Sequence, residues 1–176
     1  MVKSLTIETR TAAETRVVGE LLGRLAQGGQ VLALSGDLGA GKTTFVQGMA
    51  VGLGVLSRVT SPTFVLVNDY AAGRNLHLVH VDTYRLGDRI GDILDEAATF
   101  GLDDFLDDAA AVVAIEWAER IEPLLPADSL RVEIDPAADA PDTRVIRLTA
   151  TGPQSERLLA AVVEHSASLP RPESAG

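Results

Sequence analysis

The chain has 176 residues, of which 46% are hydrophobic, and it carries a formal net charge of −10. This length suits one domain with a hydrophobic core, but no apolar stretch approaches the roughly 20 residues needed to cross a bilayer. The lack of cysteine excludes disulfides and thiolate zinc sites, and with lysine only at Lys3 and Lys42 the chain lacks the basic face of proteins that grip nucleic acid by themselves.

The first predicted element is a helix that starts near Thr11. Thr11 and Glu14 have the spacing of a capping box. Apolar residues then follow at helical spacing, namely Val17, Val18, Leu21, Leu22 and Leu25. The glycine pair at 28–29 ends this helix, and the apolar run at 31–35 predicts a strand.

Residues 36–43 read G-D-L-G-A-G-K-T, a complete phosphate-binding loop. Its glycines let backbone N–H groups point at phosphate oxygens, and a helix predicted to end at Gly54 adds its positive dipole end. Lys42 is expected to reach the β and γ phosphates, and the Thr43 hydroxyl to ligate Mg²⁺. The predicted nucleotide contacts are Gly36, Asp37, Leu38, Gly39, Ala40, Gly41, Lys42, Thr43 and Thr44. This loop between a strand and a helix predicts binding of a nucleoside triphosphate.

The remaining chain alternates strand and helix patterns. Strands are predicted at 64–70, 76–82 and 111–116, helical segments at 86–108 with a break at Gly101 and at 119–125, and a last helix at 154–165. Residues 130–134 and 144–148 alternate strictly, which predicts a hairpin closed by a loop at 136–142. The expected fold is α/β: a P-loop NTPase-like three-layer sandwich, with a mixed, mainly parallel sheet and a C-terminal antiparallel hairpin, in one domain over 1–168. Residues 169–176 are expected to be a disordered tail.

Two acidic residues follow strands where a magnesium site would need them. Asp82 and Glu116 end predicted strands, and side chains at carboxyl strand ends point into the ligand crevice of a parallel sheet. Either acid could lie near Thr43, or each could merely cap its strand at the surface. Three hydroxyl residues precede the strand at 64–70, namely Thr60, Ser61 and Thr63, and they form either a sensor of the γ-phosphate or an ordinary Ser-Pro turn. Arg85 could neutralise charge or meet a partner.

Four sequence blocks together resemble the TsaE family, the small bacterial ATPases needed to make threonylcarbamoyladenosine on tRNA. The blocks are 36–44 (G-D-L-G-A-G-K-T-T), 61–64 (S-P-T-F), 80–86 (H-V-D-T-Y-R-L) and 115–117 (I-E-W). The resemblance covers about residues 11–151. The chain departs from the family in the hairpin loop, where residues 140–144 stand in place of the Gly-Arg pair that the family often carries.

The resemblance implies a Mg²⁺-dependent ATPase that works on the TsaB–TsaD complex and permits repeated turnover of threonylcarbamoyl transfer. It implies that Thr43 and Glu116 hold Mg²⁺ and that Asp82 is important for hydrolysis, with Lys42 completing the catalytic set. Trp117 would lie near the nucleotide, and Thr15 close to the base side of the site. We expect a cytoplasmic protein without a membrane partner, which meets tRNA only indirectly through the complex.

Other functions fit the sequence less well. A P-loop small-molecule kinase needs a lid with several arginines, whereas residues 86–108 contain one arginine among many acids, and an acidic lid would repel phosphate. A GTPase would carry an Asn-Lys-x-Asp guanine-reading motif, which the sequence lacks. A scaffold that uses ATP only for folding stays open. The acidic segment itself is either a solvated helix face or a docking surface for a basic partner.

Overall fold

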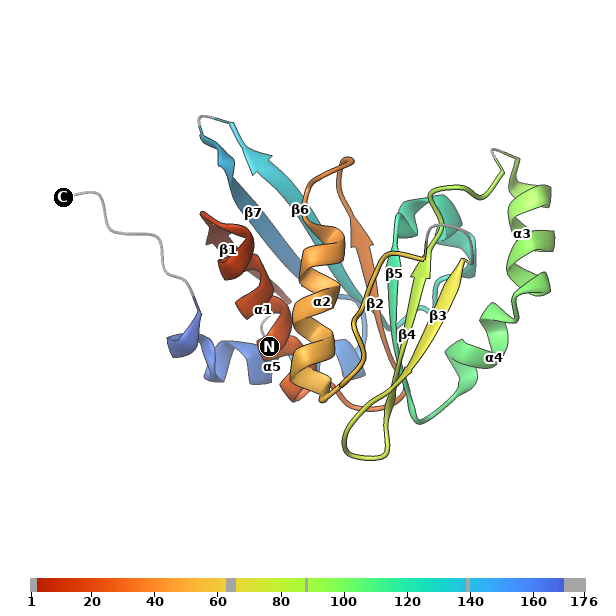
Figure 1. The fold of residues 1–176 in the computed structure, drawn as a ribbon, viewed down its shortest axis with the longest axis horizontal. Helices are drawn as coiled ribbons and strands as arrows, with labels where there is room; N and C mark the ends of the chain where they lie inside the picture. The colour runs from red at the N-terminus through yellow and green to blue at the C-terminus, as the bar shows by residue number, and fades with distance from the viewer. Residues whose placement is uncertain (1–2, 63–65, 88, 139, 170–176) are drawn as a thin grey trace.

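A seven-stranded sheet forms the centre of the computed structural model, which describes residues 3–62, 66–87, 89–138 and 140–169. The strand order is β1-β7-β6-β2-β5-β4-β3 (Figure 1). The strands are β1 (Ser4–Thr9), β2 (Gln30–Ser35), β3 (Val67–Ala71), β4 (His77–Asp82), β5 (Ala111–Glu116), β6 (Leu130–Ala137) and β7 (Ala140–Ala150). Parallel pairing joins β6, β2, β5 and β4, and antiparallel pairs flank them on both sides. The predicted α/β fold with a mixed sheet, a parallel centre and a C-terminal hairpin is confirmed.

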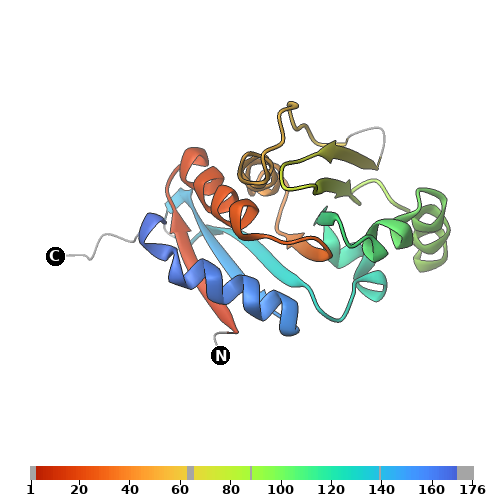
Figure 2. The ribbon, with the colours of Figure 1, turned by 90° about the horizontal axis from the view of Figure 1, so that it is seen from below.

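Helices cover the two faces of the sheet. They are α1 (Ala12–Leu25), α2 (Lys42–Leu53), α3 (Ile90–Thr99), α4 (Leu102–Asp107), α5 (Pro153–Glu164) and the short 3₁₀ helices η1 (Ala118–Leu124) and η2 (Ser166–Ser168). One apolar cluster joins α1, α2 and α5 to the sheet through residues such as Leu22, Phe45 and Leu159. A second cluster on the other face includes Leu102 and Ile121. Figure 2 shows α3 and α4 at the far end of the molecule from α1 and α5.

Helix α1 begins at its predicted cap but ends at Leu25, where Ala26 is extended, and so before the glycine pair at 28–29 that was predicted to end it; helix α2 begins and ends as predicted. The Thr11 side chain accepts a hydrogen bond from the Glu14 amide at 3.1 Å, and the Glu14 carboxylate accepts from the Arg10 amide at 2.7 Å. These bonds satisfy amides at the start of α1 that have no partner within the helix. Helix α2 begins at Lys42 and ends before Gly54, whose φ of 80° is a left-handed helix cap.

The structure adds one strand and corrects or completes two predictions. Strand β1 was not predicted, although residues 4–9 alternate polar and apolar side chains as an edge strand does. The loop predicted at 136–142 is largely strand, because β6 and β7 continue to pair beyond a register shift at Pro136 and Ala137. Of the strand predicted at 64–70, β3 confirms the second half, and residues 63–65 lie outside the described residues.

Two further predictions touch the ends of the described chain and the membrane. Of the predicted tail, only Leu169 is described, and it packs on the core with 8% of its surface exposed. No helix within the described ranges is long and apolar enough to cross a membrane.

Candidate functional site

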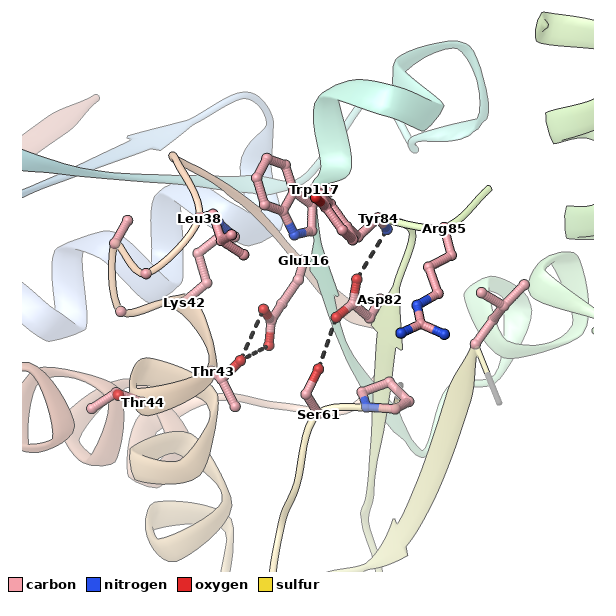
Figure 3. Close-up of a pocket in the computed structure, with 15 residues that line it drawn as sticks. Leu38, Lys42, Thr43, Thr44, Ser61, Asp82, Tyr84, Arg85, Glu116 and Trp117 are labelled. Atoms are coloured by element: carbon pink, nitrogen blue, oxygen red, sulfur yellow. Dashed lines mark hydrogen bonds between the residues drawn. The ribbon is translucent and has the colours of Figure 1, made fainter. Parts of the chain in front are cut away.

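A cavity of about 400 Å³ opens beside the phosphate loop, where β2, β4 and β5 end (Figure 3). Residues 38–44 of the loop and of helix α2 form one wall. The other residues that line it are Ser61, Pro62, Leu66, Asp82, Tyr84, Arg85, Glu116 and Trp117. The structure therefore brings the phosphate loop, both predicted acids and the tryptophan together at one edge of the sheet.

The loop backbone depends on glycine at its first position. Gly36 has a φ of 137°, which L side chains rarely adopt. A Cβ atom at this position would lie 2.2 Å from the carbonyl oxygen of Ile134 in the neighbouring strand β6. The close approach lets the chain turn sharply from β2 into the loop. Any larger residue would push the loop away from the sheet.

Lys42 is folded back against its own loop. Its ammonium group donates hydrogen bonds to the carbonyl oxygens of Gly36 and Asp37, the latter at 2.9 Å, and only 4% of the residue is exposed. Its Nζ also lies 3.8 Å from the centroid of the Trp117 ring, a cation–π contact. Burial lowers the pKa of Lys42 below its ordinary value, while nearby carboxylates, that of Glu116 foremost, act in the opposite direction.

Glu116 lies at the end of β5 and faces the first turn of α2. The Thr43 hydroxyl Oγ1 donates to both carboxylate oxygens, at 2.9 and 3.0 Å. The Nε2 atom of His80 lies 2.8 Å from Oε1 of the same carboxylate. Thr43 and His80 thus hold the carboxylate from two sides. Glu116 is only 3% exposed, so this carboxylate is largely shielded from water. A hydroxyl and a carboxylate in contact are hard oxygen ligands of the kind that Mg²⁺ prefers.

Asp82 occupies the equivalent place on the neighbouring strand. It pairs in register with Glu116, since β4 and β5 run parallel. Its carboxylate accepts hydrogen bonds from the Ser61 hydroxyl at 2.8 Å and from the Tyr84 amide at 3.0 Å (Figure 3). The two acids thus have different surroundings, because Glu116 faces Thr43 of the loop and Asp82 faces the Ser-Pro turn.

Trp117 has an unusual backbone conformation directly after Glu116. Its φ of 58° lies in the left-handed region, where residues other than glycine are uncommon and strained. The buried Thr83 hydroxyl donates to the carbonyl oxygens of Glu116 and Trp117, at 3.1 and 2.7 Å, and so ties the ends of β4 and β5 together. The conformation turns the indole over the phosphate loop, where it also packs against the tilted ring of Tyr84, with 4.9 Å between ring centroids.

Some predicted site residues lie away from the cavity. Thr15 is 2% exposed, and its hydroxyl forms a hydrogen bond with that of Thr9 at 2.8 Å. Its methyl group lies beside Gly41 of the loop. Gly36 and Asp37 do not line the cavity, and they contact Lys42 through their carbonyl groups.

The hydroxyl-rich turn is only partly described. Ser61 lines the cavity, whereas the Thr60 carbonyl accepts from the Asn68 side chain at 3.4 Å. Thr63 lies outside the described residues. The contacts of Ser61 with Asp82 are compatible with a sensor of the γ-phosphate, which stays a prediction.

Two residues that the sequence did not single out contact the site. His80 supports Glu116 from below. Arg144, which follows the tip of the β6–β7 hairpin, donates from Nε to the carbonyl oxygen of Ala40 in the phosphate loop at 3.0 Å. Its Nη1 also donates to the hairpin carbonyls of Pro141 and Thr143. His80 lies two residues before Asp82 in the H-V-D block, and this strand spacing could have indicated it. No local pattern indicates Arg144, which lies 104 positions from Ala40.

Comparison with known proteins gives a consistent result. The family model "Threonylcarbamoyl adenosine biosynthesis protein TsaE" matches residues 9–146. The chain is 40% identical to the tRNA threonylcarbamoyladenosine biosynthesis protein TsaE of Bacillus subtilis over 163 residues, which cover 93% of this chain and 96% of that protein. The TsaE protein of Streptomyces coelicolor is 42% identical over 138 residues, covering 78% of this chain and 89% of that one. A crystal structure of Bacillus subtilis YdiB superposes with a TM-score of 0.76 at 38% identity, covering 94% of this chain and 98% of that one. The chain belongs to the TsaE family of threonylcarbamoyladenosine biosynthesis proteins.

Proposed function

We propose that this protein is a Mg²⁺-dependent ATPase that binds the TsaB–TsaD complex and supports repeated rounds of threonylcarbamoylation of adenosine in tRNA. The observation that carries the proposal is the convergence of Lys42, Thr43, Asp82 and Glu116 on one cavity. These residues come from the phosphate loop and from the ends of two parallel strands. That arrangement is typical of enzymes that bind and hydrolyse nucleoside triphosphates.

Each side chain has a role in this proposal. The backbone amides of the loop and the Lys42 ammonium group bind the phosphates. To reach them, the ammonium group exchanges its hydrogen bonds with the carbonyl oxygens of Gly36 and Asp37 for contacts with the phosphates. Thr43 and Glu116 hold Mg²⁺, which when bound neutralises charge on the β and γ phosphates. Asp82, held by Ser61, orients the attacking water or the water shell of the metal.

The oxygen ligands of Thr43 and Glu116 suit a magnesium ion that also binds phosphate and water, and not a metal ion whose ligands all come from the protein. Within the described ranges, no group of three or more His, Cys, Asp or Glu side chains could enclose a metal ion. Mg²⁺ commonly binds through one or two carboxylates together with phosphate oxygens and waters, which is what Glu116, Thr43 and a nucleotide would supply.

The isolated protein is expected to hydrolyse ATP slowly. Among the described residues that line the cavity, only Lys42 and Arg85 carry positive charge. An arginine placed at the transferred phosphate is worth about 10³–10⁵ in rate, and a partner can supply or reposition it. We propose that TsaB and TsaD complete the site in this way, that tRNA is met only through them, and that the protein works in the cytoplasm. The same shortage of arginines disfavours a small-molecule kinase.

Single-turnover hydrolysis of pre-bound ATP, with and without TsaB and TsaD, tests the proposal. We expect slow hydrolysis alone and acceleration when both proteins are present. Association should weaken as salt rises if the docking surface is charged, since this chain has a net charge of −10. Fast hydrolysis by the isolated protein, unchanged by the two partners, would contradict the accessory role. Failure to bind ATP at all would contradict the ATPase itself.

A further inference from the structure

His80 is a fully buried imidazole in the middle of the sheet, directly below the candidate site. It lies in β4, two residues before Asp82, and it is 0% exposed. Because His80 pairs in register with Ala114 and Asp82 pairs with Glu116, the imidazole and the Glu116 carboxylate lie diagonally across two neighbouring strands. His80 does not line the cavity. It therefore reaches the site only through Glu116.

The contact with Glu116 assigns the hydrogen of the imidazole. An ionised carboxylate only accepts hydrogen bonds, so the Nε2 atom, 2.8 Å from Oε1, must carry the hydrogen and donate it. The Thr43 hydroxyl also donates to the same carboxylate. Glu116 is thus held between a donor from the phosphate-loop helix and a donor from β4.

The other ring nitrogen of His80 makes no hydrogen bond, so the contact of Nε2 with Glu116 is the polar contact of this ring within the described residues. Nδ1 is buried and has no hydrogen-bond partner within the described part of the chain. Burying an unpaired polar atom costs free energy, and an apolar ring of similar size would avoid that cost. A histidine at this position is therefore explained by what its Nε2 does for Glu116 rather than by packing.

We infer that His80 is a positioning residue, which holds the Glu116 carboxylate in the orientation that ligates Mg²⁺ beside Thr43; this inference deepens the proposed ATPase function and rests on it. Hydrogen bonds from outside the ligand set commonly fix the direction of a metal ligand, and their loss typically costs about 10–100-fold in metal affinity or activity. His80 does not contact the phosphates. Its loss should therefore change the magnesium requirement and leave the magnesium-free affinity for nucleotide as it is.

Three substitutions separate positioning from packing. His80→Phe keeps a planar ring and removes the donor. His80→Gln has an amide nitrogen near the place of Nε2, and His80→Asn has one that is too short to reach Glu116. Binding of the non-hydrolysable analogue AMPPNP is measured by calorimetry in EDTA and over a Mg²⁺ titration. We expect unchanged affinity in EDTA for all variants, about a 10–100-fold higher Mg²⁺ requirement for Phe and Asn, and substantial recovery for Gln.

Two controls make the result specific. His77→Gln changes another histidine of the same strand, at the end away from the cavity, and should leave the Mg²⁺ requirement unchanged. In a Glu116→Gln background, His80→Phe should add no further change, because the group through which it acts has already lost its charge. Circular dichroism and urea unfolding establish that each variant is folded. If His80→Phe does not fold, the comparison of Gln with Asn decides by the same criteria.

The inference and the proposed function fail in different ways. A folded His80→Phe with the wild-type Mg²⁺ requirement would overturn the positioning role, and so would an equal loss of affinity with and without Mg²⁺. Gln and Asn variants that behave alike would also overturn it. If Mg²⁺ had no effect on nucleotide binding by the unsubstituted protein, the proposed ATPase site itself would be wrong, whatever the variants do.

Discussion

The ammonium group of Lys42 lies over the indole ring of Trp117, 3.8 Å from its centroid. Lys42 is the residue of the phosphate loop that is expected to bind phosphate, and Trp117 is the only tryptophan of the chain. Lys42 begins helix α2, after the loop that follows β2, whereas Trp117 directly follows the end of β5. Phosphates that draw the ammonium group toward themselves must therefore change the surroundings of the indole.

The first prediction uses this contact as a signal. Addition of ATP or ADP with Mg²⁺ should change the intrinsic fluorescence of Trp117, because the charge over its ring moves and a nucleotide fills the adjoining cavity. The measurement is a fluorescence titration at saturating nucleotide. A spectrum that does not respond, in a protein shown by calorimetry to bind ATP, would place Trp117 away from the nucleotide.

The second prediction concerns Lys42 itself. Lys42→Ala removes a charge-assisted contact with the phosphates that no other lysine near the site can replace, so ATP affinity or hydrolysis should fall by about tenfold or more. The far-ultraviolet circular dichroism spectrum should stay that of the unsubstituted protein. Equal nucleotide affinity and equal turnover in the two proteins would contradict the phosphate-binding role of the loop.

The third prediction separates the two acids. Glu116 contacts Thr43, so Glu116→Gln should raise the Mg²⁺ concentration that hydrolysis requires. Asp82 contacts Ser61 instead, and Asp82→Asn should depress hydrolysis more than binding. Both are measured as ATP affinity and single-turnover rate over a Mg²⁺ titration. The reverse pattern would mean that the two roles are exchanged.

The fourth prediction tests the contact between the helices α1 and α2. A Cβ atom at Gly19 would lie 2.1 Å from the carbonyl oxygen of Phe45, so the backbones of the two helices touch there. Gly19→Ala should lower the free energy of unfolding by about 1–3 kcal/mol, because the helices must separate. Urea unfolding measures this loss.

A matched glycine provides the control for this substitution. Gly91 lies in α3, and a Cβ atom there would meet nothing within 4 Å. Gly91→Ala should be neutral or stabilise the protein by up to about 1 kcal/mol, since alanine favours the helix. If the two alanine variants were equally stable relative to the original protein, the close packing of α1 on α2 would not matter for stability.

The fifth prediction is a pH dependence of stability at the other end of β4. His77 lies between two carboxylates, with Nδ1 2.6 Å from Asp69 and Nε2 3.0 Å from Asp108, and its protonated ring donates to both. Partial burial acts to lower the pKa of His77, but the hydrogen bonds and charges of the two acids outweigh it and raise the pKa above its ordinary value. The pKa of Asp108 is lowered by its bond from the Ala110 amide and by His77.

The sign of the effect follows from these directions. A raised histidine pKa stabilises the folded state below the unfolded pKa of about 6.5, and this stabilisation is lost as the pH rises through the folded value. The lowered pKa of Asp108 stabilises the folded state at pH values above the unfolded pKa of this group, and this stabilisation is lost as the pH falls through the folded pKa. His77→Gln should therefore lower the free energy of unfolding most near about pH 5 and least above about pH 8, which lie below and above the ordinary histidine pKa of about 6.5. Urea unfolding at both pH values would contradict the pairing if the loss were the same.

The elements of the fold were predictable where the signal is local. The loop octet and the start of α2 at Lys42 follow from glycine spacing and the adjoining strand. The apolar run 111–116 is buried at every position in β5, as a central strand requires. Strand β1 was missed although its alternation is visible, and the extent of β6 and β7 was underestimated because a register shift lets pairing continue past a proline.

Within the candidate site, the sequence alone determined which chemical groups are present: a phosphate loop with Lys42 and Thr43, and acids at two strand ends. Only the tertiary structure decided which of them touch. It places Glu116 rather than Asp82 against Thr43, lays Trp117 over Lys42, and brings Arg144 to Ala40 across the sheet. Periodicity and spacing report the conformation of neighbours along the chain. A hydrogen bond between distant residues depends instead on strand order, register and the rotamers that packing allows, and these exist only once the whole sheet has formed.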